Sequence, residues 1–100
     1  MTIRHVVSWK LATTDETERA EQAARIKAGL ESLPAEIPEI LSLEVGVNAL
    51  LPGDNFDVVL ISDFADADAL DRYVQAPAHQ TVAAYIRSVT AARSAVDFPA

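Results

Sequence analysis

The 100-residue sequence contains no cysteine, which excludes a disulfide framework, a thiolate zinc site and a cysteine nucleophile. Glycine and proline are also scarce, with three and five residues, while half of all residues are hydrophobic. This composition is typical of a folded chain and not of a disordered one. No hydrophobic run approaches the roughly 18–20 residues that a membrane-spanning helix needs. The N-terminus has no signal-peptide pattern, so we expect a cytoplasmic protein. A chain of 100 residues is too short for two independent cores, so we expect a single domain over residues 1–100.

Positive charge is scarce too, because eight lysines and arginines stand against 15 acidic residues and leave a formal charge of −7. Such a chain has no electrostatic attraction to nucleic acids or anionic membranes, and we expect neither partner. The acidic residues at positions 63, 66, 68 and 71 lack the glycine and final glutamate of a calcium loop. We therefore expect no metal site among them.

Hydrophobic periodicity predicts an alternation of strands and helices. The expected strands are Ile3–Leu11, Leu43–Leu50, Phe56–Phe64 and Ala92–Phe98. The expected helices are Asp15–Leu33, a second that Asp66 caps and Pro77 ends, and a third over Ala78–Val89. This order, β-α-β-β-α-β, is the ferredoxin-like α+β arrangement, with an antiparallel four-stranded sheet that carries its helices on one face.

Local signals define the ends and faces of these elements. Thr13 and Glu16 have the spacing of a capping box at the start of the first helix. Pro52-Gly53-Asp54 predicts a short turn, and therefore an antiparallel hairpin, between the second and third strands. The residues expected to face the core from the first two helices are Ala20, Ala23, Ile26, Leu30 and Leu33, then Leu70, Tyr73 and Val74.

The third strand is apolar on both faces, with the run Val58-Val59-Leu60-Ile61. A sheet with one solvated face normally alternates apolar and polar residues. Val59 and Ile61 would form an exposed apolar patch in a monomer, and such patches usually mark interfaces. We therefore expect the open face to pack against a second copy in a two-fold homodimer. The alternative is that the two side chains are tolerated singly at the surface.

His79 and Tyr73 are the leading candidates for chemistry. Pro77 places His79 in the first turn of the third helix, where the dipole disfavours imidazolium, on the same face as Ala83 and Ile86. A neutral, inward histidine is suited to proton transfer from a carbon acid; the alternative is a structural histidine that braces a backbone group. Tyr73 can donate a hydrogen bond to a substrate carbonyl or developing enolate, or it can be a core aromatic.

His5 is the third candidate. It alternates with Ile3, Val7 and Trp9 on the first strand and therefore lies on the buried face of that strand. A buried strand histidine is more often a satisfied core residue than a catalyst. If His5 lines the same cavity as His79, it can orient a substrate or relay a proton.

The segments Ile3-Arg4-His5-Val6-Val7 and Tyr73-Val74-Gln75-Ala76-Pro77-Ala78-His79 resemble the stress-responsive A/B barrel (Dabb) family, and the resemblance extends over nearly the whole chain. It implies a ferredoxin-like fold that dimerises into an α/β barrel. The pattern is also similar to the plant polyketide cyclase that forms olivetolic acid by an aldol condensation. That similarity implies catalytic roles for His79, Tyr73 and His5. The cyclase has a further histidine on its third strand, and this position is Val58 here.

Different classes of function follow from these residues. The first is a cofactor-free acid/base enzyme of the cyclase, lyase or isomerase type that acts on a small carbonyl or polyketide-like compound in an apolar cavity. His79 would serve as base or acid, and Tyr73 would bind the carbonyl. The alternative is a non-catalytic stress-response or ligand-binding dimer in which both residues are structural. A second alternative is a cofactor-free monooxygenase, an activity known in the dimeric barrel superfamily.

Overall fold

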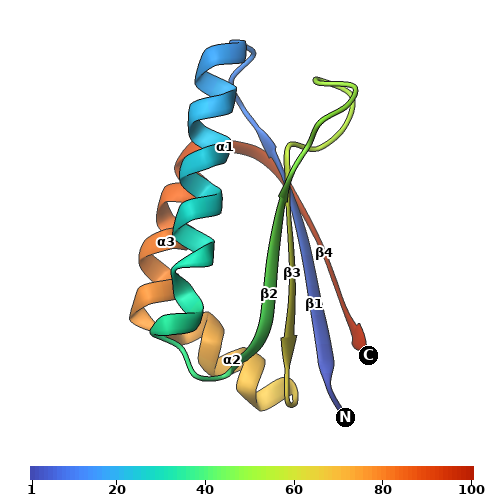
Figure 1. Ribbon diagram of the computed structural model, residues 1–100, viewed down its shortest axis with the longest axis vertical. Helices are drawn as coiled ribbons and strands as arrows, with labels where there is room; N and C mark the ends of the chain where they lie inside the picture. The colour runs from blue at the N-terminus through green and yellow to red at the C-terminus, as the bar shows by residue number, and fades with distance from the viewer.

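The computed structural model describes residues 1–100 and consists of a four-stranded sheet with its helices on one face (Figure 1). The strands are β1 (Ile3–Leu11), β2 (Ile40–Val47), β3 (Val58–Phe64) and β4 (Thr90–Pro99). The helices are α1 (Glu16–Glu31), α2 (Ala67–Gln75) and α3 (Pro77–Val89), with a 3₁₀ turn, η1, at Leu33–Ala35. None of these helices combines the length and the hydrophobicity needed to cross a membrane.

The strands lie in the order β2-β3-β1-β4, and every neighbouring pair is antiparallel. Val7 of the central strand β1 therefore lies opposite Leu60 of β3 on one side and Ala95 of β4 on the other. The two ends of the chain lie at the same end of the sheet (Figure 1), where the Ala100 amide donates a hydrogen bond to the Thr2 carbonyl at 2.9 Å. This topology confirms the predicted ferredoxin-like α+β fold.

The start of α1 differs from the prediction. Asp15, and not Thr13, is the N-cap, and its carboxylate accepts a hydrogen bond from the Glu18 amide at 2.8 Å. An aspartate at this position satisfies an orphan amide and also interacts favourably with the helix dipole. The expected capping box between Thr13 and Glu16 is therefore wrong. Asp66 caps α2 as predicted, through the Ala69 amide at 2.8 Å.

Two residues expected in the core are exposed at the surface. Ala20 is exposed because it borders a surface hollow between α1 and the segment that leaves β2, with Val47 and Asn48 on the far side. Val74 is 38% exposed because it lies in the last turn of α2, where the side chain borders a cavity described below. The other expected positions on α1, Ala23, Ile26 and Leu30, are buried as predicted.

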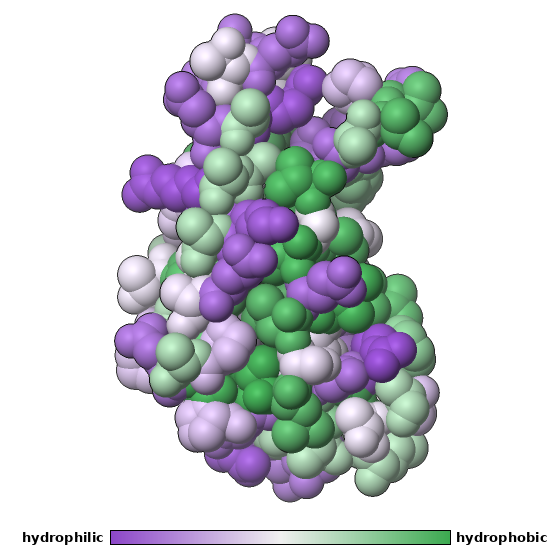
Figure 2. Space-filling model, viewed as in Figure 1, coloured by the Kyte–Doolittle hydropathy of each residue, from purple (hydrophilic) through white to green (hydrophobic).

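The connection between β2 and β3 is a loop over residues 48–57, longer than the predicted turn. β2 begins three residues earlier than expected, at Ile40, and β3 begins at Val58. The antiparallel pairing of the two strands is as predicted. Leu51 and Gly53 have positive φ angles of 50° and 92°, so the loop needs left-handed backbone at both positions. Its tip is hydrophobic (Figure 2), since Leu50 and Leu51 are 72% and 62% exposed.

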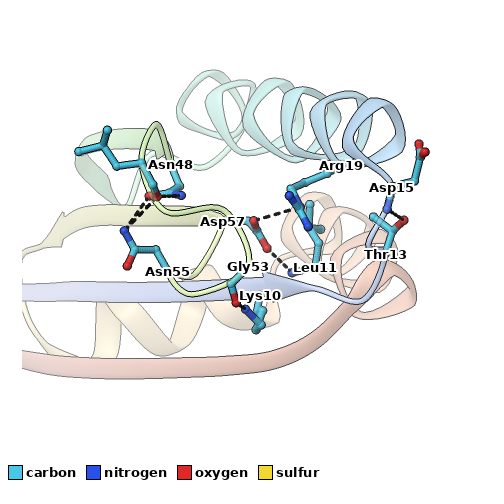
Figure 3. A network of polar contacts seen from close by, with 10 residues as sticks. Lys10, Leu11, Thr13, Asp15, Arg19, Asn48, Gly53, Asn55 and Asp57 are labelled. Carbon is cyan, nitrogen blue, oxygen red and sulfur yellow. Dashed lines mark hydrogen bonds and ion pairs between the residues drawn. The ribbon is translucent and has the colours of Figure 1, made fainter.

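Asp57 fixes the base of this loop (Figure 3). Its side chain is buried, and one carboxylate oxygen accepts a hydrogen bond from the Leu11 amide at 2.8 Å. The other oxygen lies 3.6 Å from Nε of Arg19 on α1. Its backbone carbonyl accepts from the Asn48 amide at 2.8 Å. Asp57 therefore joins the end of β1, the start of α1 and both ends of the loop, a role that the sequence alone did not indicate.

The core lies between the sheet and the helices, and the opposite face of the sheet is open. Side chains of β1 and β3 alternate, so the members facing the helices are buried, among them Val7 and Leu60 at 1% and 2% exposure. The open face carries apolar residues from three strands, which we call the open-face patch: Val6, Val59, Ile61, Val96 and Phe98. Val96 is its most exposed member, at 62%.

Candidate functional site

A cavity of about 320 Å³ lies between the sheet and the helix layer. Its wall comes from β1, β3 and β4 on one side and from α1, α2 and α3 on the other. All three histidine and tyrosine candidates, His5, Tyr73 and His79, line this one cavity. The structure therefore brings the three side chains together, and their catalytic role stays a prediction.

His79 is held in place by the end of α2. Val74 lies in the last turn of that helix, and its carbonyl accepts a hydrogen bond from Nδ1 of His79 at 2.9 Å. The same carbonyl accepts from the Gln80 side-chain amide at 2.7 Å. Such carbonyls have no partner within their own helix, which explains why both side chains turn toward it. The bond occupies Nδ1 and fixes the proton there, so Nε2 of the neutral ring is left as an acceptor.

Tyr73 is completely buried, and its ring packs between Phe64 and His79, with centroid distances of 4.9 and 4.4 Å. Its hydroxyl is buried and has no hydrogen-bond partner in the protein. Buried polar groups in native proteins are nearly always paired, so an unpaired hydroxyl on a residue that lines a cavity indicates a ligand or ordered water. Of the three candidates, only Tyr73 has a fully buried polar atom without a hydrogen-bond partner in the chain.

His5 is positioned by the edge strand β4. It lies directly opposite Asp97, and its Nδ1 forms a hydrogen bond with the Asp97 carboxylate. The histidine is buried, at 7% exposure, and its ring centroid is 6.3 Å from that of Tyr73. Because the carboxylate accepts at Nδ1, the Nε2 atom of His5 is also free for another contact.

Burial shifts the proton affinities of two of these groups. Burial is the main cause that lowers the pKa of His79 below 6.5; the Val74 carbonyl opposes this shift, and the charges of His5, Arg87 and Arg93 add to it. Burial also raises the pKa of Tyr73 to about 12. At neutral pH the site therefore pairs a neutral imidazole, able to take a proton, with a protonated phenol, able to donate a hydrogen bond.

Three further residues of the site were not foreseen: Asp97, Arg93 and Arg87. The alternation of β4 contains the signal, since Val96 and Phe98 belong to the open-face patch and therefore place Arg93 and Asp97 on the helix side. Arg87 follows His79 by two helical turns, a spacing that keeps both on one face of α3. No group of three or more histidine, aspartate or glutamate side chains has the arrangement of a metal site.

Comparison with known families matches residues 3–100 to the stress responsive A/B barrel domain, Dabb. The chain belongs to the Dabb family. The match confirms the family suggested by the segments around His5 and His79. A comparison with proteins of curated function finds no match.

Solved structures agree with this assignment. A dimeric ferredoxin-like protein of unknown function from Thermobifida fusca is 31% identical, with 98% of this chain and 90% of that chain covered and a TM-score of 0.81. A dimeric protein of unknown function from Bacteroides fragilis is 28% identical, with 97% and 94% covered and a TM-score of 0.88. Hydroxynitrile lyase from Passiflora edulis shares the fold at 16% identity, with 97% and 91% covered and a TM-score of 0.72.

Proposed function

We propose that this Dabb protein is a cofactor-free acid/base enzyme, of the cyclase, lyase or isomerase type, that acts on a small carbonyl compound in the cavity. The observation that carries the proposal is the orphan hydroxyl of Tyr73 beside the neutral ring of His79. A core tyrosine normally finds a partner for its hydroxyl, whereas a substrate-binding tyrosine is unpaired until its substrate arrives. His79 supplies the proton acceptor at the same wall of the cavity.

The chemistry follows from the free atoms of each side chain. The Tyr73 hydroxyl donates a hydrogen bond to the substrate carbonyl and stabilises the oxyanion as negative charge develops on it. Nε2 of His79 removes a proton from the carbon next to that carbonyl and returns it to the product. His5, held by Asp97, orients the polar end of the substrate through its own Nε2. The hydrocarbon part of the substrate packs against Val7, Leu60 and Ile86.

The fold supports this proposal without specifying the reaction. The Passiflora edulis protein of the same fold is a hydroxynitrile lyase, so this architecture accommodates lyase chemistry. At 16% identity, the similarity carries no substrate to this chain. The bond that His79 makes to Val74 also fits the alternative of a purely structural histidine, and the experiment below is chosen to separate the two.

We also infer that the chain forms a homodimer through the open-face patch. The two relatives that are 31% and 28% identical are both described as dimeric. An apolar sheet face of this kind, with Val96 at 62% exposure, is stabilised when a second copy covers it. Each subunit would keep its own cavity, because the cavity lies on the helix side of the sheet.

Deuterium exchange into phenylacetone, an apolar ketone with exchangeable protons beside its carbonyl, tests the proposed chemistry. We expect the wild-type protein to accelerate the exchange in D₂O, as followed by proton NMR. His79→Gln keeps a donor for the Val74 carbonyl but cannot accept a proton, so it should slow exchange by about 10²-fold or more. Tyr73→Phe should slow it as well. Tyr85→Phe makes the same change outside the cavity and should have no effect.

The outcomes separate the two functions. Exchange that depends on His79 and Tyr73 in proteins of unchanged melting temperature supports the enzyme. Binding of phenylacetone with no acceleration of exchange supports the non-catalytic ligand-binding dimer instead. A His79→Gln variant that melts far lower but retains full exchange would show that His79 is a structural brace.

A further inference from the structure

Most of the positively charged side chains have an interaction partner within the chain, and two of them do not. Six of the eight have a partner within the chain: Arg4 with Asp63, Lys10 with the Gly53 carbonyl, Arg19 with Asp57, Arg25 with the Tyr85 ring, Lys27 with Glu31 and Arg72 with Glu39. The guanidinium groups of Arg87 and Arg93 make no hydrogen bond and no ion pair. The chain has 15 acidic residues, yet neither arginine forms an ion pair with any of them.

Both unpaired arginines border the same cavity. Arg87 reaches it from α3, two turns after His79 and one turn after Ala83, which also lines it. Arg93 reaches it from β4, where it lies opposite Trp9 on the helix side of the sheet. The two cations therefore approach the cavity from its two opposite layers, and their charge reaches His79, whose pKa both of them lower.

The interior of the cavity adds a second, independent observation. The Tyr73 hydroxyl is buried there without a partner. Apart from the two histidine rings, the unpaired polar groups of the cavity therefore lie at two places. Tyr73 supplies a neutral donor from a buried residue, and the two arginines supply cations from exposed residues at the border. Between them the wall is apolar, with Val7, Leu60 and Ile86. A ligand that satisfies all of these groups carries a carbonyl, a hydrocarbon body and a negative charge.

We propose that the cavity selects anionic substrates, namely small carbonyl compounds that bear a carboxylate, and that Arg87 and Arg93 bind this carboxylate while Tyr73 faces the carbonyl. Guanidinium groups match carboxylates through paired, charge-assisted hydrogen bonds. The inference rests on the proposed function, since it names the substrate class of the same cavity. Arg87 and Arg93 act as specificity-determining residues, and proton transfer stays with His79.

Two probes of the same shape and different charge test this assignment: benzoylformate, an aromatic keto acid, and its neutral amide, benzoylformamide. Trp9 is the only tryptophan and lines the cavity, so its single indole N–H signal in a ¹⁵N NMR spectrum reports occupancy. The variants are Arg87→Gln and Arg93→Gln. Arg72→Gln removes the same charge at a site paired with Glu39, away from the cavity, and is the matched control.

We expect the wild-type protein to bind benzoylformate more tightly than benzoylformamide, with an advantage that shrinks as salt is added. Each cavity variant should weaken benzoylformate binding by about tenfold and leave benzoylformamide unchanged. The control should change neither. Equal affinities for the two probes in the wild type, or a loss that is the same for both probes in the variants, overturns the anionic assignment alone. If neither probe shifts the Trp9 signal, the proposed ligand cavity fails together with it.

Discussion

His5 and Asp97 lie directly opposite each other on β1 and β4, and Nδ1 of the imidazole is hydrogen-bonded to the carboxylate. The histidine is buried while the aspartate side chain is 46% exposed, so the pair connects the cavity to the edge of the sheet. Because the carboxylate accepts at Nδ1, it holds a proton on that nitrogen, and Nε2 is left without a partner in the chain.

We predict that Asp97→Ala changes the tautomer of His5. Without the carboxylate, the proton is no longer held at Nδ1, and the Nε2–H form should gain population. Long-range ¹H–¹⁵N NMR of the ring measures this directly. Asp97→Asn is the control, because its side-chain oxygen can still accept from Nδ1–H. An unchanged Nδ1–H ring in Asp97→Ala would mean that the carboxylate does not orient His5.

Tyr73→Phe has an expected effect on stability that distinguishes a ligand-binding hydroxyl from a structural one. The hydroxyl is buried and unpaired, so its removal should leave the free energy of unfolding unchanged or raise it by up to about 1 kcal/mol. Urea unfolding measures the difference, with Tyr85→Phe as the parallel substitution. A destabilisation of more than about 1 kcal/mol would indicate that the hydroxyl has a structural partner.

The lowered pKa of His79 predicts how stability depends on pH. Burial disfavours the imidazolium in the folded state, so near pH 6 the unfolded chain binds more protons at this position than the folded chain. The contribution is therefore fully present above pH 6.5 and is lost as the pH falls through the lower pKa of the folded state. Urea unfolding between pH 5 and pH 8 should show this loss, and it should be smaller in His79→Gln. An NMR titration that places the pKa of His79 above 6.5 contradicts the prediction.

Asp57→Ala should be the most destabilising of these substitutions. It removes the acceptor of the Leu11 amide and leaves the partly buried Arg19 without its carboxylate. We expect a loss of about 2–4 kcal/mol in the free energy of unfolding, measured in urea. Asp57→Asn, which retains an acceptor for the amide, should lose less. Asp54→Ala, in the exposed part of the same loop, is the control and should be nearly neutral.

The fold was predictable because its signals are local and periodic. Alternation in β1 places His5, Val7 and Trp9 on one face, and Pro77 marks the boundary between α2 and α3. The loop between β2 and β3 was mispredicted because the Gly53 turn is only part of it. Its true limits depend on the contact between Asn48 and Asp57, which belongs to the assembled sheet.

The candidate site was predictable only in part, for a related reason. His79 and Tyr73 are six residues apart on either side of a helix boundary, and their local sequence brings the rings together. Asp97 is 92 residues from His5 in the chain, and only the register of β1 with β4 makes them neighbours. The unpaired state of Arg87 and Arg93 depends on where every carboxylate lies in space, which no sequence motif encodes.

The dimer prediction can be tested at a single exposed position. Val96 is 62% exposed on the edge strand β4, so Val96→Asp should change the stability of an isolated chain by no more than about 0.5 kcal/mol. In a dimer closed over the open-face patch, the same aspartate would be an unpaired charge in an apolar interface, which costs several kcal/mol. We expect light scattering to give twice the chain mass of 10.8 kDa for the wild type and for Ala24→Asp, a control on the exposed side of α1. Val96→Asp should give a folded particle of one chain mass, and a wild-type particle of one chain mass would rule out the dimer.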